Sequence, residues 1–280
     1  MIKTGGYKAK SISWGDFKLD GGAMFGVVPK TLWSKKIPAD QNNMIPMKAR
    51  GLLLSGHGKN ILIDIGIGNK EDDVFLERYN IESISSSEKI LSSFHISPDE
   101  ITDVLITHLH FDHCGGSTCC KDGNIVPTFK NAKYYIQKKQ FDSAVSGKAR
   151  DRASYFERNY MPVVRNNQVI FLDGEEKNII KNIDIKISNG HTIAQQLFLI
   201  KDKENPLFYC GDIFPTSAHI PPRWVMAYDN MPEVSMSEKE ILLKQAVEEN
   251  WIMFFEHDPV IAASKIKYQN RKYVIGEVKL

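Results

Sequence analysis

Thr107–Gly116 reads THLHFDHCGG and places three of the chain's eight histidines within six residues, with an aspartate among them. The preceding stretch, ITDVLI, has the apolar pattern of a buried strand and leads directly to His108. If this strand continues to His110, the imidazoles of His108 and His110 point to the same side. Imidazole and carboxylate groups are the usual protein ligands of zinc and similar divalent metals. The stretch therefore predicts a metal site at the end of a strand.

One metal rarely takes four ligands from so short a loop, so the cluster calls for further donors elsewhere in the chain. Each of three later segments places a donor just after an apolar stretch: Gly190-His191-Thr192, Gly211-Asp212 and Glu256-His257-Asp258. Side chains at the ends of neighbouring strands meet on one rim of a sheet. We therefore expect two adjacent metals, each completed by distant residues. A solvated histidine-rich loop is the simpler alternative, and the H-x-H-x-D-H spacing argues against it.

The bulk composition is that of an ordinary globular protein. The chain has 280 residues, of which 42% are hydrophobic and 25% charged, and its formal net charge is +2. No internal repeat or linker is evident, so we expect one domain over residues 1–280. The basic residues form no block, which argues against a nucleic-acid partner. No apolar run suits a signal peptide or a membrane span, and adjacent Cys119 and Cys120 suit no disulfide framework, so a reducing cytoplasm and no membrane partner are expected.

Local patterns outline the fold. Residues 1–50 are rich in Gly and Pro and are expected to form strands joined by long loops rather than helices. A hairpin is predicted around Gly56-His57-Gly58, and a helix start at Ser97. Further strands are predicted at ITDVLITH, AKYYIQ, QVIFLDG, IDIKISNGH, IMFFEHD and KYVIGEVKL, a hairpin at LFLIKDKENPLFYCGD, and helices at KKQFDSAV and SEKEILLKQAVEENW. In the last helix, Ile241, Leu242, Ala246 and Val247 are expected to share one side. This order fits two sheets packed face to face with helices outside.

The motif order THLHFDH, GHT, GD and a late histidine resembles the metallo-β-lactamase-fold hydrolase superfamily. The resemblance implies an αββα sandwich of two mixed sheets, an α/β (α+β) fold with the metals at one edge. It also implies one metal on His108, His110 and His191. A second metal would lie on Asp112, His113 and His257, and Asp212 would bridge the two.

Two flanking stretches narrow the resemblance. LDGGAMFGVVPKTLWSKKIPAD and PTSAHIPPRWVMAYDNMP are similar to quorum-quenching N-acyl homoserine lactonases with a long N-terminal extension, which implies that residues 1–50 contribute to the pocket. The methyl parathion hydrolase group shares much of this layout. Two positions depart from the pattern: Ala194 stands where the superfamily often has Gly, and Pro215 where shorter lactonases carry a carbonyl-orienting Tyr. His219 and Tyr228 are candidates for that role.

The resemblance implies hydrolysis by a hydroxide that bridges two divalent ions, since such ions lower the pKa of a shared water. Asp112 would pass a proton to the leaving group. A lactonase acting on N-acyl homoserine lactones is the leading hypothesis, and a phosphotriesterase or arylesterase on the same site is the alternative. Zinc is the expected metal, with manganese, iron or cobalt as alternatives. The partner would be a small ester or lactone, and a homodimer is suggested by analogy alone.

Substrate selectivity would come from apolar residues around the metals. The candidates for the substrate pocket are Met24, Phe25, Trp33, Phe111, His219, Trp224 and Tyr228. Ordinary core packing explains any one of them equally well. Cys114 adjoins His113 and could line the second metal, although a small buried side chain is the simpler role. Cys210 is expected in the core.

Other functions of the superfamily fit less well. Many β-lactamases carry Cys where this chain has Asp212. A glyoxalase-type thioesterase would have a helical C-terminal region, and a nuclease would carry an extra domain and more basic residues. Di-iron redox members replace the histidine at His110 by Glu and add a flavin domain. A non-enzymatic module with a decayed site would lack ligands, whereas all expected ligands are present here.

Overall fold

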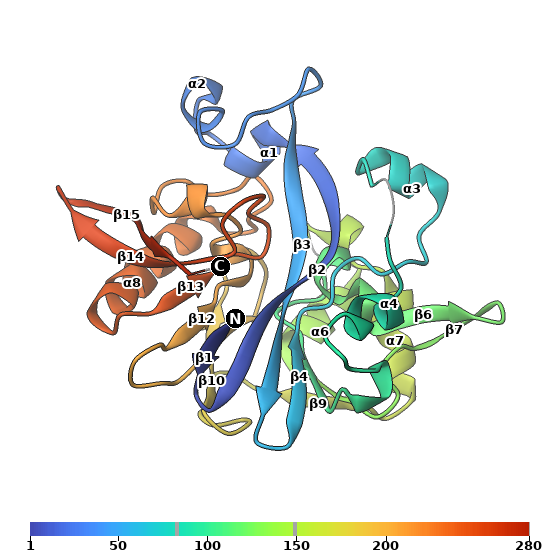
Figure 1. The fold of residues 1–280 in the computed structure, drawn as a ribbon. Coiled ribbons are helices and arrows are strands. Elements are labelled where there is room, and N and C mark those ends of the chain that lie inside the picture. The colour runs from blue at the N-terminus through green and yellow to red at the C-terminus, as the bar shows by residue number, and fades with distance from the viewer. Residues whose placement is uncertain (82–83, 148–149, 280) are drawn as a thin grey trace. The chain divides into compact units, whose positions relative to one another are not determined.

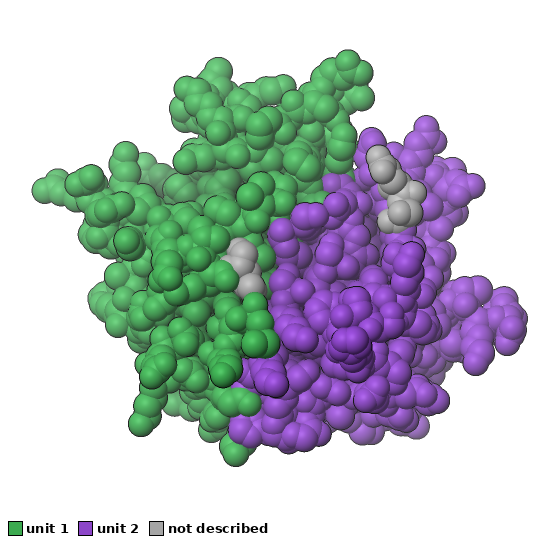
Figure 2. All heavy atoms as spheres, viewed as in Figure 1, with its two compact units in different colours: residues 1–6, 18–47, 174–280 green, residues 7–17, 48–173 purple. Residues whose placement is uncertain are grey.

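The computed structural model describes residues 1–81, 84–147 and 150–279. Contacts within the chain divide it into two compact units, coloured green and purple in Figure 2. Unit 1 comprises residues 1–6, 18–47 and 174–280, and unit 2 comprises residues 7–17 and 48–173. The expectation of a single domain stays a prediction.

Unit 2 contains most residues of a mixed sheet in which strands run in the order β2-β3-β4-β5-β8-β9 (Figure 1). The β3–β4 pair is antiparallel, whereas β4–β5, β5–β8 and β8–β9 are parallel. A separate antiparallel pair is formed by β6 and β7. The strands are β2 (Tyr7–Asp20), β3 (Met44–Gly56), β4 (Lys59–Ile63), β5 (Asp103–Leu105), β6 (Thr118–Lys121), β7 (Asn124–Pro127), β8 (Lys133–Gln137) and β9 (Val169–Leu172).

Short helices follow the strands of unit 2. They are α3 (Asp73–Arg78), α4 (Ser87–Ser92), α5 (Phe111–Cys114), α6 (Lys138–Ser146) and α7 (Glu157–Arg165). Three 3₁₀ turns accompany them: η1 (Pro98–Glu100), η2 (Gly115–Ser117) and η3 (Arg152–Ser154). Helix α6 packs against β8, and α7 packs against β6 and β7. The parallel strands and their crossover helices give this unit its α/β character.

Unit 1 contains a second sheet with the order β10-β11-β12-β13-β14-β15. Its pairs are antiparallel except for β12–β13, which is parallel. The strands are β10 (Ile183–Ser188), β11 (Gln195–Ile200), β12 (Leu207–Tyr209), β13 (Ile252–Phe254), β14 (Ala263–Gln269) and β15 (Lys272–Val278). The unit also holds β1 (Ile2–Thr4), α1 (Gly21–Phe25), α2 (Lys30–Trp33), α8 (Pro232–Glu248), η4 (Gly211–Ile213) and η5 (Ser217–His219).

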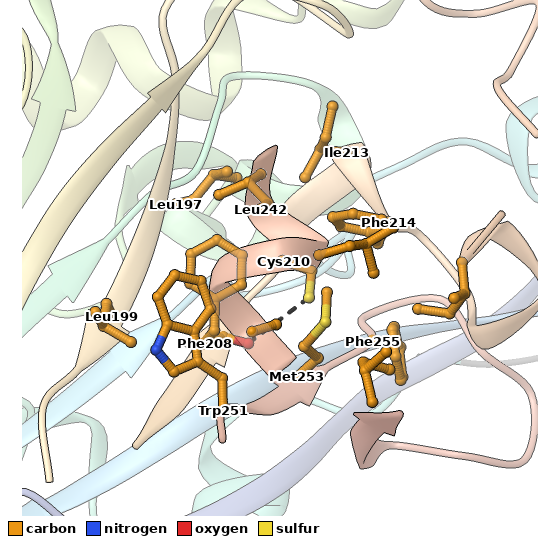
Figure 3. Packing of buried hydrophobic residues seen from close by; sticks show 14 residues of the cluster. Leu197, Leu199, Phe208, Cys210, Ile213, Phe214, Leu242, Trp251, Met253 and Phe255 are labelled. Atoms are coloured by element: carbon orange, nitrogen blue, oxygen red, sulfur yellow. Dashed lines mark hydrogen bonds between the residues drawn. The ribbon is translucent and has the colours of Figure 1, made fainter. Parts of the chain in front are cut away.

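Helix α8 closes the apolar core of unit 1 against the sheet (Figure 3). Leu242 and Ala246 of the helix belong to the same buried cluster as Phe208 of β12. The Trp251 ring stacks on Phe208 with a centroid distance of 4.8 Å. Cys210 also lies in this cluster, which confirms its predicted place in the core.

The helical face predicted for α8 is partly wrong. Ile241 is 60% exposed, whereas Leu243 is fully buried. The helix also begins at Pro232, earlier than predicted, because a proline suits its first turn. The buried side of α8 includes Lys239, and this charged residue interrupts the apolar pattern by which the buried face would be predicted from the sequence.

The prediction that residues 1–50 contain no helix is also wrong. Helix α1 forms because the Asp20 side chain accepts a hydrogen bond of 2.7 Å from the backbone N–H of Ala23. Pro29 directly precedes the first residue of α2 and presets its backbone. Glycine and proline thus mark helix boundaries here as well as loops.

Most other local predictions are confirmed. Strands β3 and β4 form the predicted hairpin, in which His57 and Gly58 have positive φ angles of 52° and 73°. Ser97 begins a 3₁₀ turn with a capping box rather than a longer helix. The predicted strand ITDVLITH ends at Leu105, and Leu280, the end of the last predicted strand, lies outside the described residues. Within the described residues, no helix is long and apolar enough to cross a membrane.

Candidate functional site

The histidine-rich segment of unit 2 is held in place by Asp64. This residue directly follows β4 and has a positive φ of 48°. Its carboxylate accepts hydrogen bonds from the backbone N–H of Thr107 at 2.8 Å and from the Thr107 hydroxyl at 2.6 Å. Since both groups are fully buried, these bonds fix the path of the chain just before His108.

The donors of this segment are buried and close together. His108 and His113 are fully buried, and His110 and Asp112 are 6% and 8% exposed. Nε2 of His108 lies 3.0 Å from Nδ1 of His110, and Nε2 of His113 lies 3.8 Å from Asp112. Because β5 ends at Leu105, the prediction that the strand continues through His108 and His110 and places both on one face is wrong. A loop and the start of α5 bring the two rings together instead.

In His108, His110 and His113, the second ring nitrogen contacts an oxygen of a neighbouring side chain. Nδ1 of His108 lies 3.0 Å from the Thr107 hydroxyl, and Nδ1 of His113 lies 3.1 Å from Asp64. Nε2 of His110 lies 2.8 Å from Asp151, which also accepts a hydrogen bond of 2.8 Å from the Tyr155 hydroxyl. These contacts orient the rings so that their remaining nitrogens face one another.

Unit 1 carries a second group of donors around Asp212. One oxygen of Asp212 lies 3.3 Å from Nε2 of His191, and the other lies 3.1 Å from Nε2 of His257. Nδ1 of His191 lies 3.0 Å from Asp229. All four residues are buried, with at most 7% of their surface exposed. The Asp212 carboxylate therefore joins two histidines, with one oxygen directed at each.

Backbone contacts with the start of α8 position His191. The carbonyl oxygens of Gly190 and His191 accept hydrogen bonds from Met231 and Asn230 at 2.8 and 3.0 Å. A side chain at Gly190 would clash, because a Cβ there would lie 2.2 Å from the hydroxyl of Ser235. Ala194, which departs from the family pattern, has a positive φ of 54°, a conformation that explains why glycine is favoured there.

The chemistry of these donors fits divalent cations. Five buried imidazoles and two carboxylates form the predicted set: His108, His110, Asp112, His113, His191, Asp212 and His257. In four of the five histidines, one ring nitrogen contacts a carboxylate or hydroxyl outside this set. Metal-binding histidines characteristically donate their second N–H in this way, which fixes the tautomer and the ring orientation.

Three of the carboxylates that orient these rings were missed from the sequence: Asp64, Asp151 and Asp229. Asp64 had a usable signal, since it follows the apolar strand ILI in the same way as the predicted ligands follow theirs. Asp151 and Asp229 had none, because each lies in an irregular polar segment far along the chain from its histidine.

Five of the predicted pocket residues pack together in unit 1. The Phe25 ring stacks on Trp33 and on His219, with centroid distances of 5.1 and 4.5 Å, and meets Trp224 edge-on at 5.8 Å. Met24 and Phe25 are essentially unexposed. These contacts provide the packing role, and a role in substrate binding stays a prediction. Tyr228, the sixth, is 40% exposed.

His219 has both ring nitrogens in hydrogen-bond contact. Nδ1 lies 2.7 Å from the Thr216 hydroxyl, and Nε2 lies 2.8 Å from the Met24 carbonyl oxygen, to which it can donate. Burial, and then the charge of Lys239, lowers the pKa of His219 to about 4. The imidazole is therefore neutral near pH 7, and it ties α1 to η5.

This buried histidine should make the fold sensitive to acid. The unfolded chain binds a proton near pH 6.5 and the folded chain only near pH 4, so stability falls as the pH drops through this window. We expect proton uptake by His219 in the unfolded chain to lower the free energy of unfolding by about 2 kcal/mol when the pH falls from 7 to 5. Urea unfolding at both pH values measures this effect. Between pH 7 and pH 5, the free energy of unfolding of His219→Gln should fall by about 2 kcal/mol less than that of the wild type. The exposed His95, changed to Gln, is the control; equal pH dependence in all three proteins would refute the assignment.

Phe111, the pocket residue predicted in unit 2, joins a separate aromatic group. Its ring meets Phe75 edge-on at 5.1 Å, Tyr79 at 5.0 Å and Phe156 in a stacked arrangement at 5.6 Å. The neighbouring Cys114 is fully buried, and burial raises the pKa of its thiol to about 12. Cys114 therefore stays protonated near neutral pH, as a packing residue does.

Comparison with known proteins gives a family and several relatives. The family model described as metallo-beta-lactamase superfamily matches residues 51–257. N-acyl homoserine lactonase of Bacillus thuringiensis is 24% identical over 210 residues, which cover 71% of this chain and 76% of that protein. The crystal structure of a probable metal-dependent hydrolase from Staphylococcus aureus is 30% identical, covers all of both chains and gives a TM-score of 0.87.

The structure of AidC, a dizinc quorum-quenching lactonase, covers 100% of this chain and 97% of its own. Its TM-score is 0.80 at 20% identity, so this likeness concerns the fold alone. The family match spans most of the chain and includes all seven predicted metal ligands. The mixed α/β units and the buried donors agree with it. The chain belongs to the metallo-beta-lactamase superfamily and is a metal-dependent hydrolase of that fold.

Proposed function

We propose that the protein is a dinuclear hydrolase that opens lactones, with N-acyl homoserine lactones as the first class to test. The observation that carries the dinuclear part is the Asp212 carboxylate, whose two oxygens face two different histidines of unit 1. A carboxylate that contacts each partner through a separate oxygen suits a bridge between two cations.

The proposed ligands are the seven donors of the sequence motif. His108, His110 and His191 would hold one ion, Asp112, His113 and His257 the other, and Asp212 both. The supporting observation is ring orientation. One nitrogen of each of His108, His110, His113 and His191 contacts an oxygen outside the ligand set. The other nitrogen of each ring faces another member of the set, as ligands of a shared metal site would. Zinc, which AidC carries, is the metal to test first.

Two bound divalent ions would lower the pKa of water, so that hydroxide is available near neutral pH, and would polarise a carbonyl. Asp112 would then carry a proton to the leaving oxygen, since its carboxylate stands beside His113 and keeps some solvent exposure. Asp64, Asp151 and Asp229 would hold the rings and exchange no proton with the substrate.

The substrate class rests on the relatives. Curated proteins that match over about three quarters of their length are N-acyl homoserine lactonases, and AidC was solved with the product N-hexanoyl-L-homoserine. An acyl chain would require apolar walls, for which the residues named from the sequence remain the candidates. Opening such lactones would inactivate quorum-sensing signals, so the proposed role is quorum quenching.

A substrate panel with and without a chelator tests this proposal. The purified protein should carry about two divalent ions per chain and open short- and long-chain N-acyl homoserine lactones, measured by acid release at constant pH. Prolonged chelation should reduce the rate by more than about 100-fold, and added zinc should restore it. Paraoxon-type triesters, aryl esters and a β-lactam complete the panel. Turnover of those compounds without lactone opening would agree with a metal-dependent hydrolase and would refute the proposed lactonase activity.

A further inference from the structure

The middle of α8 buries a lysine that the proposed chemistry does not use. Lys239 is only 1% exposed, although Ile241 and Lys244 of the same helix face solvent. Burial of an ammonium group is costly, because the surrounding protein solvates a charge less well than water does. A methionine would fill similar space without this cost. Packing alone therefore does not explain a lysine at this position.

The Lys239 amine connects α8 to residues 224–229. Its Nζ donates a hydrogen bond of 2.6 Å to the carbonyl oxygen of Trp224 and lies 5.2 Å from the centre of the Phe214 ring. A hydrogen bond from a charged donor is among the stronger ones in proteins, and the face of an aromatic ring attracts a cation. The hydrogen bond fixes the start of the 224–229 segment against the helix.

The 224–229 segment ends at the carboxylate that orients His191. Asp229 contacts Nδ1 of His191 at 3.0 Å, and the segment that carries Asp229 is irregular. An irregular segment is held by individual hydrogen bonds rather than by a helix or a sheet ladder. The N–H of Asp229 donates to the Met226 carbonyl oxygen at 3.2 Å, which keeps the end of the segment compact. A shift at its first residue, Trp224, would therefore also move Asp229.

The residue before Lys239 holds the other side of the same contact. The Glu238 carboxylate accepts hydrogen bonds from the Ser188 hydroxyl at 2.6 Å and from the backbone N–H of Asn189 at 3.0 Å. Ser188 and Asn189 lie just before His191 in the chain. Two neighbouring residues of α8 thus hold the chain that carries His191 and the chain that carries its carboxylate partner.

We propose that Lys239 is a positioning residue: its amine bonds the 224–229 segment to α8 and thereby keeps Asp229 against His191. Lys239 acts through the orientation of the His191 ring and takes no part in bond making or breaking. This inference deepens the proposed function and rests on its assignment of His191 as a metal ligand.

The hydrogen bond from Lys239 is available in both charge states of the amine. Burial lowers the pKa of Lys239 to about 7, and the negative charge of Asp229 opposes this shift. The ammonium and the neutral amine both carry N–H groups, so either form can donate to the Trp224 carbonyl oxygen. Lys239 therefore holds the segment on both sides of neutral pH, and the hydrogen bond is stronger below it.

Lys239→Met is the first variant, because it keeps most of the side-chain volume and removes the amine. Loss of a residue that orients a metal ligand typically costs 10- to 100-fold in metal affinity. We expect the dissociation constant of one of the two zinc ions to rise about 10-fold, measured by competition with a chromophoric chelator. The thermal midpoint of the metal-free protein should stay close to that of the wild type. Lys244→Met, at an exposed position of the same helix, is the matched control and should bind zinc as the wild type does.

A double-mutant cycle with Asp229→Asn separates positioning from general packing. If Lys239 acts through Asp229, Lys239→Met should weaken zinc binding by less than about 2-fold once Asp229 has been replaced. Equal losses in both backgrounds would overturn the proposal, and so would an unchanged zinc affinity of Lys239→Met. If Lys239→Met does not fold, Lys239→Gln, whose side chain is uncharged and shorter, takes its place in the cycle.

Zinc binding also distinguishes this inference from the lactonase proposal. A wild type that binds two zinc ions and opens no lactone would refute the lactonase activity, and the cycle would still decide the role of Lys239. A wild type that binds no zinc would refute the dinuclear site and the role of Lys239 together.

Discussion

Replacing Asp212 by asparagine should abolish most of the activity and release bound metal. The change keeps the shape of the side chain but turns one of its two oxygens into an N–H₂ group, which repels a cation and faces a histidine nitrogen. Loss of an orienting residue behind a ligand typically costs 10- to 100-fold, so loss of a bridging ligand should exceed about 100-fold in kcat/KM.

Metal analysis and kinetics on the same sample measure this effect. The metal content should fall below the two ions per chain that we expect for the wild type, and added zinc should restore activity only in part. Asp173→Asn, which changes an exposed carboxylate at the end of β9, is the control for general effects of lost charge. Full activity with unchanged metal content in Asp212→Asn would refute the bridging role.

Phe25→Ala should produce the largest loss of stability. The Phe25 ring is 0% exposed and lies in stacking contact with Trp33 and His219. Truncation of a buried Phe to Ala typically costs about 3–5 kcal/mol, because it removes apolar contacts and leaves a cavity. Urea unfolding at neutral pH measures the change. Val27→Ala, at a residue that is 91% exposed, should shift stability by less than about 0.5 kcal/mol.

The same variant tests the acyl-groove prediction. If Phe25 lines a groove, its truncation should raise KM for long-chain lactones more than for short ones. An equal change at both lengths would leave packing against α2 and η5 as the role of this ring. A loss of less than about 1 kcal/mol would instead show that the stack around Phe25 contributes little to the fold.

The sequence predicted the features that depend on neighbours in the chain. Apolar runs mark most of the strands, the His57-Gly58 turn marks the β3–β4 hairpin, and the spacing around His108 indicates a metal site. These signals succeed because pleat, turn geometry and motif spacing extend over only a few residues. They were less reliable where polar residues are buried, as the exposed Ile241 and the buried Lys239 of α8 show.

Only the tertiary structure revealed the partners of the donors. Asp64, Asp151 and Asp229 lie 49, 41 and 38 residues from the histidines that they orient. The rings of Tyr79 and Phe111 also meet, with a centroid distance of 5.0 Å, although the two residues lie far apart in the chain. Hydrogen bonds and ring contacts form between whatever atoms the folded chain brings within reach, so a pattern that repeats over a few residues carries no record of them. The sequence thus determined the family of this protein and the chemical types of its clustered donor side chains, whereas the fold decided which carboxylates orient the histidines.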